Sequence, residues 1–218
     1  MTPPSPAPHR TPIPHLPGIV WGLILLCLLP ELVLQGADHG LWGSARWRPL
    51  AYQNGAFWAG LLYGWRPNYG LQPGSMFLTY AWLHGGLGHL AGNLLVLGWL
   101  GPLIAARMGA WGVAAVWLAA TLGGAAAFGA LTTSPAPMVG ASGALFGLAG
   151  ALIICDGRAR RRAGTGLVRT TTTALGLGLG LAAFNLAAWV MLSGQLAWET
   201  HLGGALAGAT VAMLWRRP

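Results

Sequence analysis

The chain has 218 residues, of which 55% are hydrophobic and 7% are charged. A soluble domain carries roughly a quarter charged residues, so this composition excludes a soluble globular domain and predicts a membrane protein with several spans. The formal net charge of +8 comes from twelve arginines without lysine, which lie in short clusters between apolar runs as in cytoplasmic loops, so we expect no nucleic-acid partner.

The N-terminal part divides into a tail, a first span and a long connection. Residues 1–17 are rich in proline, which predicts a disordered cytoplasmic tail, and residues 18–218 are expected to form one membrane domain. An apolar run from Gly18 to about Gly36 predicts the first span. Residues 38–75 are rich in Trp and Tyr and contain three arginines, which is typical of a segment lying in the membrane interface.

Five further apolar runs predict five further spans, at about 76–105, 110–131, 140–156, 170–192 and 196–215. The fold class expected from this order is an all-α bundle of six transmembrane helices with a long interfacial first loop. Six spans place both termini on one side, and that side holds nine of the twelve arginines. The positive-inside rule therefore predicts cytoplasmic termini.

Polar side chains inside a membrane are energetically unfavourable and are candidates for function. The predicted spans contain few of them: His84, His89 and Asn93 in the second, Ser142 in the fourth, Asn185 in the fifth and His201 in the sixth. Asn185 is expected to make an interhelical hydrogen bond. Because the even-numbered spans run in the same direction, the polar residues that they carry lie in the outer half of the bilayer.

Two of these spans carry glycines at helical spacing, namely Gly143, Gly147 and Gly150 in the fourth and Gly204 and Gly208 in the sixth. Small residues at such spacing let membrane helices pack closely, which would bring Ser142 toward hydrogen-bond distance of His201. A glycine stripe alone is more often only a packing device. The histidine beside it favours an activated serine nucleophile.

The remaining groups of an acyl-transfer site can be assigned from helical geometry. Glu199 lies about 200° around the helix from His201, and no other carboxylate is well placed, so a Ser–His dyad is predicted. His89 and Asn93 are four residues apart on one helix face, and both can donate to an oxyanion together with the backbone N–H of Ser142. His84 lies about 140° away from His89 and is expected to support the first connection.

A metal or haem site formed by His84, His89 and His201 is the competing interpretation. The five-residue spacing of the first two fits one helix face poorly, no thiolate or carboxylate assists them, and the H-E-x-x-H pattern is absent. We therefore expect no metal and no cofactor.

Three segments together resemble the rhomboid family of intramembrane serine proteases, of the bacterial type with six spans. They are HGGLGHLAGN at 84–93, GASGALFG at 140–147 and THLGGALAG at 200–208. The resemblance implies that Ser142 is the nucleophile and His201 the general base. It also implies an oxyanion hole formed by His89, Asn93 and the Ser142 backbone, with Gly140 giving the loop its conformational freedom.

The sequence departs from the family pattern in two respects. Many members carry Tyr four residues after the serine, packed on the catalytic histidine, and Phe146 keeps only the ring. Many members also carry a Trp-Arg pair ahead of the second span, where this chain has Ser75 and Met76. The second departure leaves the shape of the first loop and the substrate choice open.

The resemblance implies an endopeptidase in a bacterial inner membrane that cuts single-span membrane proteins near the outer face of the bilayer. Two alternatives stay open: a non-catalytic rhomboid-like scaffold or chaperone, and a protease dedicated to C-terminal sorting signals. The intact pair of Ser142 and His201 favours a protease over a scaffold.

Overall fold

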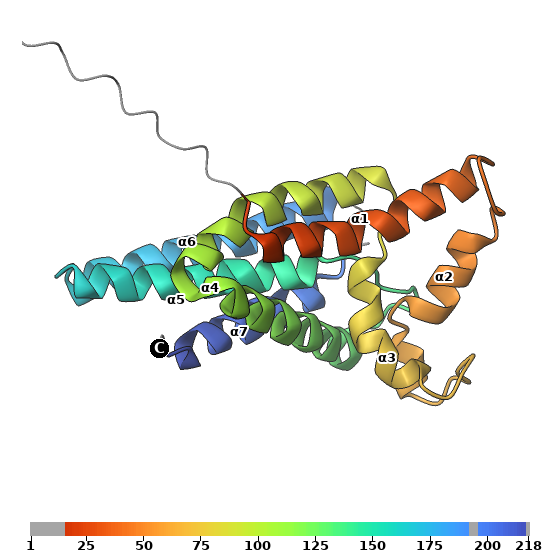
Figure 1. The fold of residues 1–218 in the computed structure, drawn as a ribbon. Coiled ribbons are helices and arrows are strands. Elements are labelled where there is room, and N and C mark those ends of the chain that lie inside the picture. Colours follow the sequence, from red (N-terminus) through yellow and green to blue (C-terminus); the bar gives the residue numbers. More distant parts are fainter. Residues whose placement is uncertain (1–15, 192–195, 217–218) are drawn as a thin grey trace, which may run out of the picture.

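The computed structural model describes residues 16–191 and 196–216, which form seven α-helices and two short 3-10 turns (Figure 1). The α-helices are α1 (Gly18–Asp38), α2 (Trp47–Gly55), α3 (Gln72–Thr79), α4 (Leu87–Leu131), α5 (Ser142–Arg162), α6 (Leu167–Met191) and α7 (Trp198–Leu214). The turns are η1 (Ala59–Leu62) and η2 (Tyr80–Trp82). The predicted all-α fold class is confirmed, whereas most of the predicted tail and the side chain of Asn185 lie outside the described part.

Three of the described helices, α1, α4 and α5, are long and apolar enough to cross a membrane. Helix α4 has 45 residues and contains Gly109 with φ of 75°, a left-handed conformation that glycine adopts without steric strain. The chain reverses there, so the second and third predicted spans are the two halves of α4, which run in opposite directions in Figure 1. The count of six spans stays a prediction.

The predicted start of the second span, near Met76, is wrong. Residues 72–82 form α3 and η2, and Gly86, with φ of 111°, separates them from α4. Met76 and Tyr80 of this stretch face protein, because both are fully buried in a cluster with Phe57, whereas Leu78 is exposed. His84 therefore lies in a loop ahead of α4 and not within a span.

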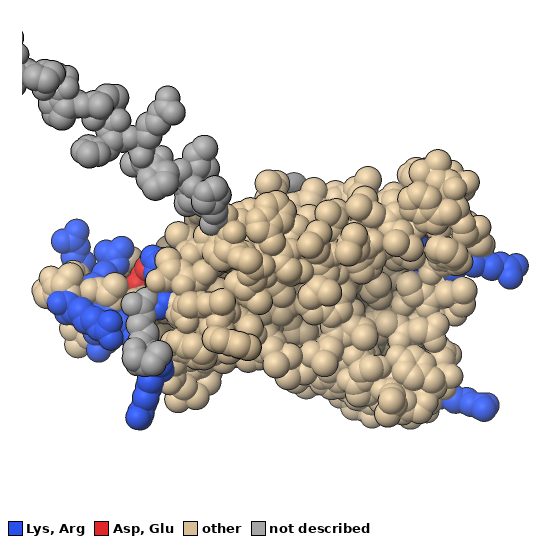
Figure 2. Space-filling model, in the orientation of Figure 1, with Lys and Arg blue, Asp and Glu red and all other residues tan. Residues whose placement is uncertain are grey.

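The other end of the molecule carries most of the arginines. Helix α5 continues to Arg162, beyond the predicted end at Asp156, and its last turn consists of basic residues, which complement the helix dipole. Basic side chains gather where α5 ends and α6 begins, and on the face shown they are sparse at the opposite end (Figure 2). Arg107, beside the reversal of α4, pairs with Asp156 at 2.7 Å at the arginine-rich end.

Helices α4, α5 and α7 pack against one another in the interior. The glycine stripes of α5 and α7 meet as predicted, because a Cβ added to Gly204 would collide with the carbonyl oxygen of Gly143, and one added to Gly208 with that of Gly147. The two backbones are therefore in contact, as small residues permit in membrane helices. This contact determines how closely the first turns of α5 and α7 approach.

Candidate active site

Ser142 and His201 meet where α5 and α7 begin. Ser142 is the first residue of α5, and His201 lies in the first turn of α7 with 6% of its surface exposed. Ser142 Oγ and His201 Nε2 lie 2.8 Å apart, which is hydrogen-bond distance. The glycine contact between the two helices brings these side chains together across 59 residues of sequence.

An aromatic ring determines the plane of the His201 imidazole. Phe146 lies one turn after Ser142 on α5, and its ring stacks on that of His201 with centroids 4.2 Å apart and planes 5° from parallel. The ring contact expected at this position is thus present without the tyrosine hydroxyl. Stacking of this kind restricts rotation of the imidazole while its Nε2 faces Ser142.

His89 and Asn93 come from the first two turns of α4 and border the backbone just before Ser142. A Cβ atom on residue 140 would lie 2.6 Å from His89 Cε1, 2.8 Å from His89 Nε2 and 3.6 Å from Asn93 Nδ2. Gly140, whose φ is 121°, is therefore required both for its conformation and for this close approach. Asn93 Nδ2 is buried and has no hydrogen-bond partner among the described residues.

The backbone N–H of Ser142 is a third donor at the same place. The first N–H groups of an α-helix have no acceptor within the helix, and the helix dipole favours negative charge at this end. Three groups that can donate hydrogen bonds, the Ser142 N–H and the side chains of His89 and Asn93, therefore border the short segment from Gly140 to Ser142. An oxygen that becomes negatively charged is stabilised in such a region.

Contacts from distant parts of the chain fix the turn that precedes Ser142. Phe57 and Met138 exchange two backbone hydrogen bonds of 3.0 and 2.9 Å, and the Gly140 N–H donates to the Tyr80 carbonyl at 3.0 Å. The Thr200 hydroxyl also contacts the sulfur of Met138. The first loop and α7 thereby hold the backbone that presents the serine.

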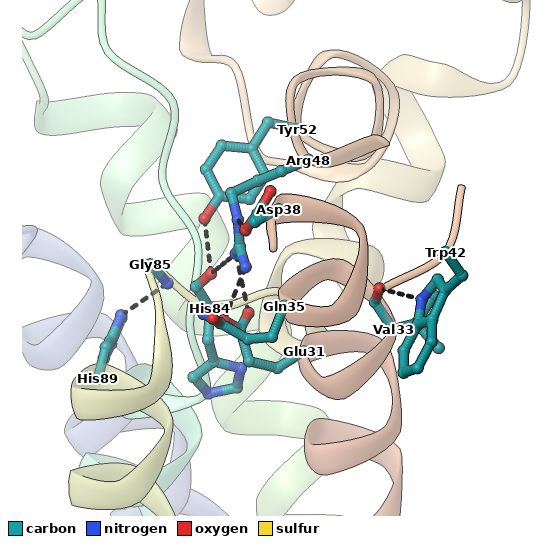
Figure 3. A network of polar contacts seen from close by, with 10 residues as sticks. All are labelled: Glu31, Val33, Gln35, Asp38, Trp42, Arg48, Tyr52, His84, Gly85 and His89. Atoms are coloured by element: carbon teal, nitrogen blue, oxygen red, sulfur yellow. Dashed lines mark hydrogen bonds and ion pairs between the residues drawn. The ribbon is translucent and has the colours of Figure 1, made fainter. Parts of the chain in front are cut away.

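The structure also contains a polar network that the sequence interpretation missed (Figure 3). Glu31 is fully buried on α1 and pairs with Arg48 of α2, and hydrogen bonding to Glu31 raises the pKa of Arg48. Arg48 and Tyr52 both donate to the backbone carbonyl of His84, so two side chains of the first loop contact the segment ahead of α4, while the predicted supporting role of His84 stays a prediction. An acidic residue in an apolar run requires a cation nearby, and this signal was present in the sequence.

The structure thus brings Ser142, His201, His89 and Asn93 together, while their chemical roles stay predictions. A comparison with curated proteins found no match. The model of the Rhomboid domain family matches residues 72–218, a range that begins with α3 and includes all four side chains. The chain therefore belongs to the rhomboid family and is an integral membrane protein.

Proposed function

We propose that this protein is an intramembrane serine endopeptidase that uses Ser142 as nucleophile and His201 as general base. The observation that carries the proposal is the 2.8 Å contact between Ser142 Oγ and His201 Nε2 beside three hydrogen-bond donors. A nucleophile, a base and an oxyanion site within contact distance are the groups that acyl transfer requires. Membership of the rhomboid family supports the same activity, because the family generally consists of serine proteases.

The geometry supports the following reaction. His201 Nε2 accepts the hydroxyl proton while Ser142 Oγ attacks the carbonyl carbon of the scissile peptide bond, and the electron pair of the carbonyl moves onto its oxygen. That oxyanion accepts hydrogen bonds from the Ser142 N–H, His89 Nε2 and Asn93 Nδ2. The C–N bond then breaks, and the leaving amine takes the proton from His201. A water molecule, deprotonated by His201, hydrolyses the acyl-enzyme and restores Ser142.

The proposed substrates are single-span membrane proteins, cut near the outer face of the bilayer. The candidate site lies at the beginnings of α4, α5 and α7, whereas the arginines gather at the end of α5. Placing the arginines in the cytoplasm directs the site outward, in a bacterial inner membrane with cytoplasmic termini. Opening a helix in hydrocarbon leaves unsatisfied backbone groups, so Gly or Pro below the cut should favour cleavage.

Labelling with a serine-directed fluorophosphonate tests whether the nucleophile exists. We expect the purified full-length protein in detergent to be labelled, Ser142→Ala to remain unlabelled, and the control Ser134→Ala, in an exposed loop, to be labelled like the wild type. Absence of labelling in the wild type, or equal labelling of Ser142→Ala, would support the non-catalytic scaffold instead.

Cleavage of designed substrates tests the rest of the proposal. A single span is compared with a variant whose Gly and Pro residues are replaced by Leu, and the cut is mapped by mass spectrometry. We expect slower cleavage of the all-Leu span and a cut near its outer end. Moving the same span from the interior of a substrate to its C-terminus distinguishes a general endopeptidase from one dedicated to C-terminal sorting signals, because only the latter rejects the internal span.

A further inference from the structure

A buried carboxylate on α1 holds a guanidinium in a fixed place beside the candidate site. The Glu31 side chain is 0% exposed, and a carboxylate shielded from water requires compensating cations and donors. Arg48 donates from Nη1 to Glu31 Oε2 at 3.0 Å and from Nη2 to Glu31 Oε1 at 2.9 Å. The Gln35 amide also donates to Glu31 Oε1, at 2.8 Å. Asp38 accepts from Arg48 Nε at 2.6 Å. The guanidinium is thus fixed from three of its nitrogens.

The same guanidinium contacts the peptide group that joins residues 84 and 85. Arg48 Nη1 donates to the carbonyl of His84 at 3.1 Å, and the Tyr52 hydroxyl donates to the same oxygen at 2.6 Å (Figure 3). Both donors belong to α2, which lies about 30 residues earlier in the sequence than the 84–85 peptide. The carbonyl therefore takes its direction from the first loop.

Planarity of the peptide group transmits this direction to His89. The oxygen of His84 and the N–H of Gly85 belong to one planar unit and point in opposite directions, so fixing one fixes the other. The Gly85 N–H donates to His89 Nδ1 at 3.3 Å (Figure 3). A cationic donor on the carbonyl also polarises the peptide and strengthens its N–H as a donor.

A hydrogen bond accepted at Nδ1 determines which nitrogen of His89 carries the proton. A neutral imidazole that accepts at Nδ1 is protonated at Nε2. The Nε2 edge of His89 faces Gly140, beside the turn that presents Ser142. The polar network therefore aims an N–H, and not a lone pair, at the region where the oxyanion would form.

We propose that Arg48 and Tyr52 are positioning residues for His89: by fixing the 84–85 peptide they keep His89 protonated at Nε2 and directed at the oxyanion of the reaction. This inference rests on the proposed protease function and extends it to the first loop. It assigns the ion pair of Glu31 and Arg48 a role in the rate of the chemical step in addition to its contribution to folding.

Tyr52→Phe tests the inference with the smallest structural change, since it removes only one hydroxyl. We expect kcat and the rate of fluorophosphonate labelling to fall about three- to tenfold with KM unchanged, less than the roughly 100- to 1,000-fold loss on deleting an oxyanion donor. Tyr63→Phe is the matched control, because Tyr63 also donates from the first loop to a backbone carbonyl, that of Gly129, at 2.8 Å. Equal kcat in Tyr52→Phe and wild type would overturn the inference.

The Arg48 contact is tested in a form that avoids an unpaired buried charge. The double variant Glu31→Gln/Arg48→Gln removes both charges, and we expect a kcat loss about tenfold larger than that of Tyr52→Phe, because a charge-assisted donor is lost as well. Arg46→Gln, an exposed arginine of the same loop, is the control and should keep wild-type kcat. A double variant that remains folded and cleaves like the wild type would contradict the proposal.

A measurement of the His89 tautomer separates failure of this inference from failure of the proposed function. The chain has six histidines, and ¹⁵N labelling of histidine with His89→Gln as the assignment variant identifies the His89 signals. We expect protonation at Nε2 in the wild type and a shift toward the Nδ1-protonated form in the double variant. Protonation at Nδ1 in the wild type, or an unchanged tautomer in the double variant, would overturn the inference whether or not the protein is a protease.

Discussion

The contact between α5 and α7 and the first loop both border the candidate site, but different forces hold them in place. Between α5 and α7 the backbones touch through glycines, at Gly204 against Gly143 and at Gly208 against Gly147. The position of the first loop is determined by the ion pair between the buried Glu31 of α1 and the partly buried Arg48 of α2, together with the hydrogen bonds of that pair. The comparison teaches that the distance between Ser142 and His201 depends on packing, whereas the direction of His89 depends on polar contacts.

The largest expected effect comes from removing the two side chains that packing brings together. Ser142→Ala and His201→Ala should each lower the rate of cleavage by about 10⁴-fold or more, and the double variant should be no worse than either single one, because the two groups act as a unit. Thermal unfolding in detergent should remain close to that of the wild type. Additive losses in the double variant would show that the two residues act independently.

The glycine contact itself can be broken by one methyl group. In Gly204→Ala the added Cβ collides with the Gly143 carbonyl, so α5 and α7 must separate. Overpacking of this kind lowers stability by about 1–3 kcal/mol, and misplacing reactive groups by about 1 Å lowers rates about 100-fold. We therefore expect a lower unfolding temperature together with a large loss of kcat.

A glycine outside the contact provides the control for this substitution. Gly98 lies on α4, and a Cβ added there meets no atom within 4 Å. Gly98→Ala should keep wild-type kcat and raise stability by up to about 1 kcal/mol, because alanine favours the helix. If Gly98→Ala and Gly204→Ala had equal effects, the contact between α5 and α7 would not determine the Ser–His distance.

Asn93→Ala should have a smaller effect that tests the oxyanion site. We expect kcat to fall about tenfold to 1,000-fold, because one donor is lost while His89 and the Ser142 N–H remain. Gln72 is a suitable control, since its buried amide donates to the Gln53 carbonyl at 2.6 Å in the first loop. Gln72→Ala should lower stability with little change in kcat. If Asn93→Ala lowered only stability, its amide would be a packing group.

The sequence predicted the two regions unequally well. The motifs around Ser142 and His201 and the glycine spacing are local patterns, and the structure places these residues together. The start of the second span was predicted too early, because apolar residues such as Met76 and Tyr80 look alike whether they face lipid or protein. Only the fold shows that they belong to the core beneath the first loop.

The polar network of the first loop was not predictable for a different reason. Glu31 requires a cation, but three arginines of the first connection were equivalent candidates in the sequence. The choice of Arg48 depends on how α2 folds back over α1, which is a long-range feature of the chain. The link from Arg48 through the 84–85 peptide to His89 involves a backbone group, which no side-chain pattern reveals.

The smallest expected effect on catalysis comes from the arginine-rich end, far from both regions. Arg158 of α5 donates to the Ala212 carbonyl at 2.5 Å and to the Met213 carbonyl, and it thereby satisfies the last carbonyls of α7. These groups have no partner within the helix, and a cation there complements the helix dipole. Arg158→Gln should lower stability by about 1–3 kcal/mol and leave kcat unchanged.

Arg162→Gln is the control, because it removes the same charge from the exposed last turn of α5. In the described part of the chain, Arg162 makes no hydrogen bond to a carbonyl of α7. We expect only a small change in unfolding temperature, since exposed charges contribute little. A salt titration distinguishes the two possible origins of the Arg158 effect, because salt screens the field of the arginine cluster more than it weakens a direct hydrogen bond. Equal shifts for Arg158→Gln and Arg162→Gln that both disappear in high salt would assign the effect to net charge, and the end of α7 would then not depend on Arg158.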